Sequence, residues 1–282
     1  MEPTYLNIAY GEHERHRIDL YLAKSDWPTP MYLHIHGGGF RHGDKSGVSG
    51  RMVEELNSAG ISVASMNYRL TGTDPYPAPF DDGVRAVQFL RFKSKEYGLD
   101  KDRFGCGGRS AGGGITFWIG FKPDRADPEH EDPVCRESSR LQCIASNDAQ
   151  SSYDCNFIKT IISGPAWKES ALLELFRLQP EQFDTADAKR MFYESSALNH
   201  VTSESPPVCL SFARHDVPMS EEIDSGHGIH HPVFGRLLKE KMDSLGVHCE
   251  VHYREDVGDL DEDAAKEALL DKRLAFLKER LL

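Results

Sequence analysis

The segment from Gly107 to Gly114 limits the choice of fold more than any other part of the chain. It reads GGRSAGGG and contains the pattern G-x-S-x-G with Ser110 at its centre. A strand-like run at residues 103–107 precedes it and an apolar, helix-like run follows. A serine on such a strand-to-helix turn is exposed above the sheet, and glycines beside it leave room for close backbone contacts. We therefore expect Ser110 to be a nucleophile. A phosphate-binding loop is the alternative, but neither the dinucleotide pattern nor a Walker lysine is present.

Strand-like and helix-like segments alternate from about residue 30 onward. The expected strands cover residues 31–36, 61–68, 103–107, 141–146, 208–213 and 248–253, and the expected helices lie near 50–59, 81–95 and 262–281. Residues 5–10 and 16–23 indicate an antiparallel entry hairpin. This alternation predicts an α/β protein, with a doubly wound, mostly parallel sheet in a single domain over residues 1–282.

The segment from about residue 150 to 206 interrupts this alternation. It is much longer than an ordinary crossover and contains expected helices near 169–176 and 186–195. We interpret it as a helical cap inserted above the carboxyl edge of the sheet. The alternative is a decorated crossover without a role at the site.

A second glycine motif, His36-Gly37-Gly38-Gly39-Phe40, ends the first parallel strand. Consecutive glycines allow backbone N–H groups to point into a cavity. Together with the N–H of Ala111, these groups would form an oxyanion hole for a tetrahedral intermediate. A glycine triplet without the serine motif would more simply indicate a flexible turn.

Residues 30–120 resemble the hormone-sensitive-lipase-like and carbohydrate-esterase branches of the α/β-hydrolase fold, including acetyl-xylan and feruloyl esterases. The similarity is carried by HGGGFRHGDKS, NYRLTGTDPYPAPFDDGVRAVQFLR, YGLDKDRFGCGG and RSAGGG, in that order. The resemblance implies an α/β-hydrolase fold and a carboxylesterase that cleaves small carboxylic esters through an acyl-Ser110 intermediate. It also implies that Gly38, Gly39 and Ala111 form the oxyanion hole, and that Asp81 and Asp82 are structural supports.

The catalytic acid is expected at Asp216, which follows the strand at 208–213 and precedes Val217-Pro218. The triad order serine, acid, histidine then requires a histidine further along the chain. Family members carry it before the last helix, but here residues 255–263 read EDVGDLDED and contain none. Asp259 stands roughly at the family position, and a carboxylate is a much weaker base than imidazole near neutral pH.

Three explanations of this departure remain open. The first is that a histidine from residues 225–232 reaches Ser110, and we assign His231, with His230 as the alternative and His227 behind both. The second is a weak or inactive relative that binds a ligand without hydrolysing it. The third is a substitute base, either a carboxylate and water at Asp256 or Asp259, or a group supplied by a partner.

Composition narrows the set of partners. The formal net charge of −12 argues against nucleic acid and anionic membranes, and no apolar run approaches the length of a membrane span. The N-terminal residues do not resemble a secretory signal, so we expect a cytoplasmic protein, leaving open a signal removed beforehand. We expect a small-molecule ester as the partner and leave a homodimer open.

The sequence suggests neither a cofactor nor a metal, because no metal-ligand spacing stands out. We expect the six cysteines to be reduced thiols, with a bridge among Cys135, Cys143 and Cys155 as the alternative. A peptidase or amidase would use the same residue types. The missing histidine weighs more against that reading, because an amine leaving group depends more on protonation.

Overall fold

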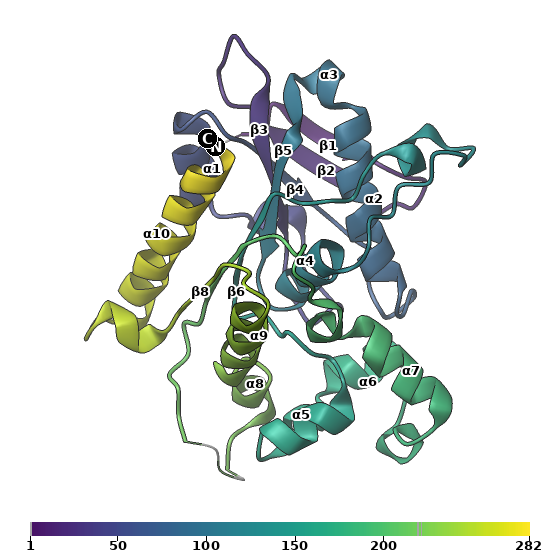
Figure 1. Ribbon diagram of the computed structural model, residues 1–282, viewed down its shortest axis with the longest axis vertical. Coiled ribbons are helices and arrows are strands. Elements are labelled where there is room, and N and C mark those ends of the chain that lie inside the picture. Colours follow the sequence, from purple (N-terminus) through teal and green to yellow (C-terminus); the bar gives the residue numbers. More distant parts are fainter. Residues whose placement is uncertain (1, 219, 221) are drawn as a thin grey trace.

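The computed structural model describes residues 2–218, 220 and 222–282. Its centre is an eight-stranded sheet in the order β1-β2-β4-β3-β5-β6-β7-β8 (Figure 1). The strands are β1 Tyr5–Ala9, β2 Arg17–Tyr21, β3 Thr29–Ile35, β4 Ser62–Met66, β5 Leu99–Gly108, β6 Cys143–Asn147, β7 Val208–Ser211 and β8 Cys249–His252. β1, β2 and β4 pair antiparallel and the remaining neighbours pair parallel, so the expected entry hairpin and mostly parallel sheet are confirmed.

Helices occupy both faces of this sheet. They are α1 Gly50–Ser58, α2 Ala78–Phe92, α3 Ser94–Tyr97, α4 Ala111–Phe121, α5 Cys155–Ile161, α6 Ser170–Phe176, α7 Ala186–Ser195, α8 Ser225–Gly228, α9 Val233–Ser244 and α10 Glu262–Leu281. Short 3-10 helices are η1 Lys45–Gly47, η2 Pro133–Arg136, η3 Pro165–Lys168, η4 Pro180–Gln182, η5 Ala197–His200 and η6 Arg254–Val257. α5, α8 and α9 were not among the expected helices.

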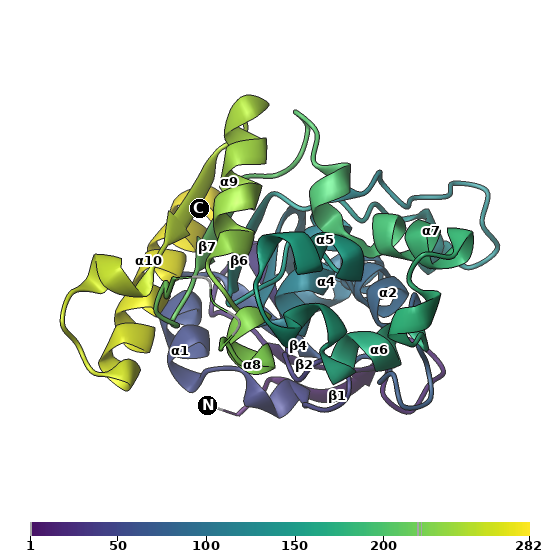
Figure 2. The same cartoon turned by 90° about the horizontal axis from the view of Figure 1, so that it is seen from below.

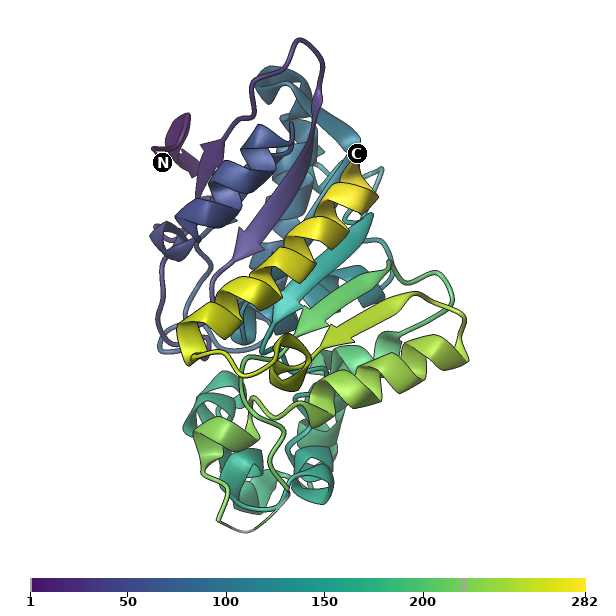
Figure 3. The same cartoon turned by 90° about the vertical axis from the view of Figure 1, so that its left-hand side faces the viewer.

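Two apolar layers hold these helices on the sheet. α1 and α10 cover one face, where Tyr32, Val63 and Cys209 of the strands belong to one buried cluster (Figure 3). α2, α4 and α9 cover the opposite face in a second, larger cluster. Central parallel strands are therefore buried on both sides, which explains why they read as short, continuous apolar runs.

The last helix shows how the sequence specifies these layers. Asp261 caps α10 by accepting a hydrogen bond from the Ala264 N–H at 2.8 Å, and acidic residues follow in the first turn. The expected apolar stripe is buried as a whole; its members are Ala265, Leu269, Leu270, Leu274, Leu277 and Leu281. The beginning of α10 lies at the carboxyl edge of the sheet (Figure 3).

The chain between β6 and β7 forms α5, η3, α6, η4, α7 and η5. These elements lie beyond the carboxyl ends of the strands, and α8 lies beside them in the view from below (Figure 2). Gly228 of α8 packs on η3 so closely that a Cβ there would lie 2.8 Å from the Ala166 Cβ. The inserted segment and the connection after β7 therefore meet above the edge where Ser110 lies.

All six cysteines carry free thiols. Among the described residues, no helix combines the length and the apolar character needed to cross a membrane.

The turn after β5 is packed against the end of β3 without space for side chains. A Cβ on Gly108 would lie 2.2 Å from the Ile35 carbonyl oxygen, and one on Gly112 would lie 2.1 Å from the same oxygen. Both distances are far below van der Waals contact. The glycines of G-x-S-x-G are thus required by the approach of two adjacent strands.

We expect Gly112→Ala to lower the free energy of unfolding by about 1–3 kcal/mol or more, because the backbone of β3 must shift to admit the methyl group. Gly50→Ala is the matched control, since no heavy atom lies within 4 Å of a Cβ there. Urea denaturation followed by circular dichroism measures both variants. Equal stability of Gly112→Ala and the wild type would contradict the packing argument.

Candidate active site

Ser110 occupies a strained turn between β5 and α4. Its backbone angles are φ 50° and ψ −119°, a conformation that non-glycine residues rarely adopt. Such strain costs on the order of 1–3 kcal/mol and persists because the surroundings impose it. Here the Ser110 N–H donates to the Asn147 carbonyl at 3.0 Å, which fixes the turn to the end of β6.

The glycine loop that follows β3 lies directly against this turn. A Cβ on Gly37 would be 3.6 Å from the Ser110 Cβ, and Gly38 and Gly39 have positive φ angles of 113° and 59°. Within the described part of the chain, no acceptor takes a hydrogen bond from the N–H groups of Gly38, Gly39 and Ala111. All three residues line a pocket of about 770 Å³ that also contains Ser110. The arrangement provides unpaired backbone donors beside the serine.

His36 holds the start of this loop. Its ring stacks on Tyr68 at a centroid distance of 4.3 Å, and its Nδ1 lies 2.7 Å from the Gly37 carbonyl, to which it donates. Burial lowers the pKa of His36 to about 4, so the ring is neutral near pH 7. The Tyr68 hydroxyl donates to the His36 carbonyl at 3.1 Å.

Asp82 also has a supporting position. It is buried, accepts hydrogen bonds from the Arg69 backbone and side chain, and lies 3.0 Å from His16 Nε2. Asp81 lies in a separate surface pocket beside Trp118.

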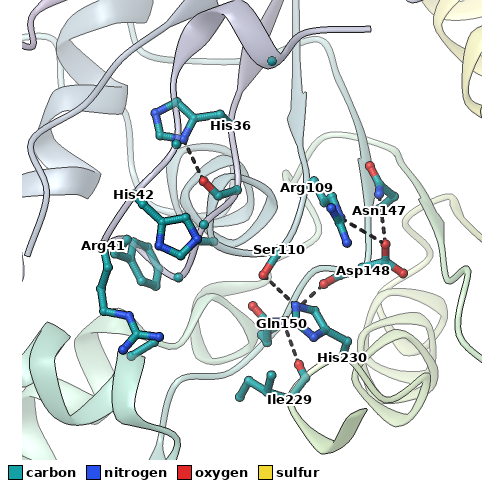
Figure 4. Close-up of a pocket in the computed structure, with 18 of the residues that line it drawn as sticks. His36, Arg41, His42, Arg109, Ser110, Asn147, Asp148, Gln150, Ile229 and His230 are labelled. Atoms are coloured by element: carbon teal, nitrogen blue, oxygen red, sulfur yellow. Dashed lines mark hydrogen bonds and ion pairs between the residues drawn. The ribbon is translucent and has the colours of Figure 1, made fainter. Parts of the chain in front are cut away.

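His230 is the histidine that reaches the serine. Its Nε2 lies 2.8 Å from Ser110 Oγ (Figure 4). Its Nδ1 lies 2.7 Å from the Gly226 carbonyl oxygen. A carbonyl oxygen can only accept, so Nδ1 must carry the proton and Nε2 of the neutral ring must be the acceptor. This tautomer has its lone pair directed at the serine hydroxyl.

Two contacts hold the segment that carries His230. Gln150 donates from Nε2 to the Ile229 carbonyl at 2.6 Å, which ties the residue before His230 to the end of β6 (Figure 4). Ser225, the first residue of α8, donates to the Glu169 carboxylate of the inserted segment. Glu169 also lies 4.0 Å from Arg41 of the glycine loop.

Two expected residues lie elsewhere. His231, our first choice for the base, is buried with its Nε2 3.0 Å from the Val217 carbonyl, while its Nδ1 accepts from the Val233 N–H. Asp216 is exposed, pairs with Arg236, and lies 3.6 Å from His231 rather than beside His230. Both nitrogens of His231 are used within its own loop, so the assignment moves to His230, the alternative. His227 contacts the carbonyl of His215.

The carboxylate whose charge acts on His230 is Asp148, which sequence reasoning missed. Asp148 follows β6, has a positive φ of 50°, and is buried. Its Oδ1 accepts from the Ala213 N–H at 3.0 Å, and its Oδ2 lies 3.6 Å from Arg109 Nε. A carboxylate directly after a buried parallel strand was the signal that could have identified it.

Burial lowers the pKa of His230 below its ordinary value, and the Gly226 hydrogen bond and the Asp148 charge partly oppose this change. The ring is therefore neutral, and able to accept a proton, at neutral pH. One group of potential metal ligands occurs in the described residues, at Cys209, Glu250 and His252. It lies on β7 and β8 outside this pocket, and Glu250 already contacts His248 and His252.

Comparison with known proteins identifies the family of the chain. The family model BD-FAE matches residues 18–222 of the 282. The chain belongs to the BD-FAE family. This is a carbohydrate-esterase family within the α/β-hydrolases, as the resemblance of residues 30–120 predicted.

Curated proteins similar to this BD-FAE chain include a probable carboxylic ester hydrolase, LipM, of Mycobacterium tuberculosis, 26% identical over 224 residues. That match covers 76% of this chain and 49% of LipM. An AB hydrolase superfamily protein of Schizosaccharomyces pombe is 25% identical over 195 residues, covering 69% of this chain and 56% of that protein. The chain thus spans about half the length of these relatives.

Solved structures share the fold over nearly the whole chain. An acetyl ester-xyloside bifunctional hydrolase from Caldicellulosiruptor lactoaceticus matches with a TM-score of 0.72 and 22% identity, covering 98% of both chains. Esterase 2 of Thermogutta terrifontis, phosphonylated by sarin, matches with a TM-score of 0.73 and 18% identity, covering 99% of this chain and 96% of that chain. The predicted α/β-hydrolase fold is therefore confirmed.

For this BD-FAE chain we expect the pKa of His230 to lie below 6.5 and to fall further in Asp148→Asn, because that variant removes a nearby negative charge that favours the imidazolium. NMR titration of the histidine ring protons measures it, with His230→Gln providing the assignment. Asp216→Asn is the control: it should lower the pKa of His231 and leave that of His230 unchanged. An unchanged His230 pKa in Asp148→Asn would remove Asp148 from the electrostatics of the site.

Proposed function

We propose that the protein is a serine hydrolase that cleaves small carboxylic esters through an acyl-Ser110 intermediate. The observation that carries this proposal is the 2.8 Å contact between Ser110 Oγ and His230 Nε2, made by a histidine whose other nitrogen is fixed as a donor. A serine hydroxyl becomes a useful nucleophile when a positioned base accepts its proton.

The first half-reaction forms the acyl-enzyme. Ser110 Oγ attacks the ester carbonyl carbon while its proton passes to His230 Nε2, and the carbonyl oxygen becomes an oxyanion. The tetrahedral intermediate then collapses, and the His230 imidazolium gives the proton to the leaving alkoxide, which departs as the alcohol. In the second half-reaction, water takes the place of the serine and His230 again transfers the proton, which releases the acid.

The oxyanion is assigned to the free N–H groups of Gly38, Gly39 and Ala111. These donors belong to rigid backbone, so they need no reorganisation when the negative charge develops. Loss of one such donor typically costs about 2.7–4 kcal/mol of transition-state stabilisation. The location of Ala111 at the start of α4 adds the positive end of the helix dipole.

The orienting role of the usual acid is divided between two groups in this proposal. The Gly226 carbonyl sets the tautomer of His230, and the buried Asp148 carboxylate supplies negative charge that favours the imidazolium formed during the reaction. Asp216, the acid expected from the sequence, has no part in this scheme.

The names of the relatives support an ester as the substrate. LipM is described as a carboxylic ester hydrolase, and the Caldicellulosiruptor protein as an acetyl ester-xyloside hydrolase. We propose that the segment at 150–206 acts as a cap, since Glu169, Ala171 and Leu172 line the same pocket as Ser110. Short acyl esters, including sugar acetates, are the substrate class that we propose.

We expect the wild type to hydrolyse p-nitrophenyl acetate and butyrate, and both Ser110→Ala and His230→Ala to lose about 10³-fold or more in kcat/KM, because each removes a member of the proton-transfer pair. Initial rates at pH 7.5 measure this, and mass spectrometry after treatment with a fluorophosphonate detects the adduct on Ser110.

His231→Gln and Asp216→Asn are matched controls. They change a neighbouring histidine and the sequence-predicted acid, and kcat/KM should stay within a fewfold of the wild type. Loss of activity in His231→Gln but not in His230→Ala would reverse the assignment of the base. A folded wild type as inert as Ser110→Ala would refute the esterase and favour a ligand-binding relative.

A further inference from the structure

The pocket continues past Ser110 toward α10, where it reaches an arginine inside the apolar stripe of that helix. Arg273 follows Leu270 by three residues and precedes Leu277 by four, so it projects from the same helix face as these buried leucines. It lines the pocket together with His34, Asn147 and Ser110.

Arg273 has one hydrogen-bond partner in the described part of the chain. Its Nη1 donates to Asn147 Oδ1 at 2.8 Å, while its Nε is buried with no acceptor. No carboxylate of the described residues forms an ion pair with this guanidinium. A largely buried cation without an anionic partner is unfavourable, because the desolvation of the charge is not compensated.

The carboxylates of the pocket are directed to other groups. Asp44 accepts from Asn67, Asp148 from Ala213 and Asn147, Glu169 from Ser225 and Ser170, and Glu267 from Arg51. The other pocket cations each have an acidic neighbour: Arg41 has Glu169, Arg109 has Asp148, and Lys266 has Glu262. Among the described residues that line the pocket, Arg273 is thus the cation without a carboxylate at ion-pair distance, and the charges of Asp148 and Glu267 act on it only from farther away.

A second buried polar nitrogen without a hydrogen-bond partner in the described residues lies close to it. His34 stands near the carboxyl end of β3, and its Nδ1 is buried without a hydrogen-bond partner in the described residues. Burial, together with the smaller effects of the nearby His36 and Arg273, lowers the pKa of His34 to about 3. The ring is therefore neutral, so it can donate one N–H without adding positive charge next to Arg273.

We infer that Arg273, assisted by His34, binds a carboxylate group of the substrate, so that the preferred ester carries an acidic group besides the bond that is cleaved. A guanidinium offers paired N–H donors whose spacing matches the two oxygens of a carboxylate. Asn147 occupies Nη1, Nε is enclosed by protein atoms, and Nη2 makes no hydrogen bond with the described residues, so Nη2 is the donor left for the ligand. This inference rests on the proposed function for the position of the scissile ester at Ser110.

Two acidic esters test the inference, each beside a neutral comparator. Mono-4-nitrophenyl glutarate carries the carboxylate on the acyl side and is compared with p-nitrophenyl butyrate. 4-Acetoxybenzoate carries it on the leaving-group side and is compared with phenyl acetate. We expect Arg273→Gln to reduce kcat/KM roughly tenfold to a hundredfold for at least one acidic ester, and to change the neutral esters less than twofold.

Arg273→Lys keeps the charge but not the planar fork, and we expect an intermediate loss on the same acidic ester. Lys266→Gln is the matched control, because Lys266 lies on the same helix and lines the same pocket but has Glu262 beside it. Its kcat/KM values should stay near those of the wild type. Equal kcat/KM ratios of acidic to neutral ester in the wild type and Arg273→Gln, for both pairs, would overturn the inference.

Thermal unfolding with and without glutarate keeps the two proposals separable. Glutarate should raise the Tm of the wild type and of Ser110→Ala, but not that of Arg273→Gln. If this stabilisation occurs while no ester is hydrolysed, the anion subsite stands and the esterase fails. If neutral esters are hydrolysed and glutarate stabilises neither protein, the esterase stands and the subsite fails. A melting curve of each variant without ligand shows that it is folded.

Discussion

The contact between the turn after β5 and the end of β3 is the constraint on which the rest of the site depends. Gly108 and Gly112 press against the Ile35 carbonyl with no room for a side chain. This close contact holds Ser110 at a positive φ angle. It also places the glycine loop that follows β3 next to Ser110. The proposed nucleophile and the backbone N–H groups that no described residue accepts from thus follow two adjacent parallel strands. The two large apolar clusters on the sheet faces offset the local strain.

The proposed base, His230, is held in place by different contacts, because it does not directly follow a strand. His230 lies in the connection between β7 and α9. Its position depends on the hydrogen bond from Gln150 to the Ile229 carbonyl and on the hydrogen bond from Ser225 to the Glu169 carboxylate. The carboxyl ends of parallel strands gather their loops along one edge. A histidine from the β7 connection can therefore reach the serine although the loop after β8 has none. What the new location lacks is a carboxylate at Nδ1, and the Gly226 carbonyl provides the orientation without the charge.

The sequence predicted the fold well, and it predicted the turn on which Ser110 lies, because both depend on local patterns. The strands and the helices α1, α2, α6, α7 and α10 lie close to the expected ranges, and apolar periodicity indicated α2 and α10. The turn at Ser110 was indicated by its glycines, which the close contact with β3 requires. The choice between His230 and His231 could not be made from sequence. Successive residues on a tight turn point in different directions, and hydrogen bonds of the turn decide which one faces the pocket. The sequence predicted that Asp216 follows β7 at the edge of the sheet near Ser110. It could not predict that the Asp216 carboxylate pairs with Arg236 and does not contact His230. Asp148 carried a usable signal, a carboxylate directly after a buried strand.

Arg273 illustrates the limit of reasoning from total charge. A net charge of −12 concerns long-range interactions with large polyanions, which are screened within about 10 Å at moderate salt. It does not determine the field inside a pocket, where a partly buried guanidinium without a carboxylate at ion-pair distance acts strongly on its immediate surroundings. A helix that needed only to cover the sheet would be more stable with a leucine or methionine at this position. The arginine in the apolar stripe is therefore better explained by a ligand than by the stability of the fold.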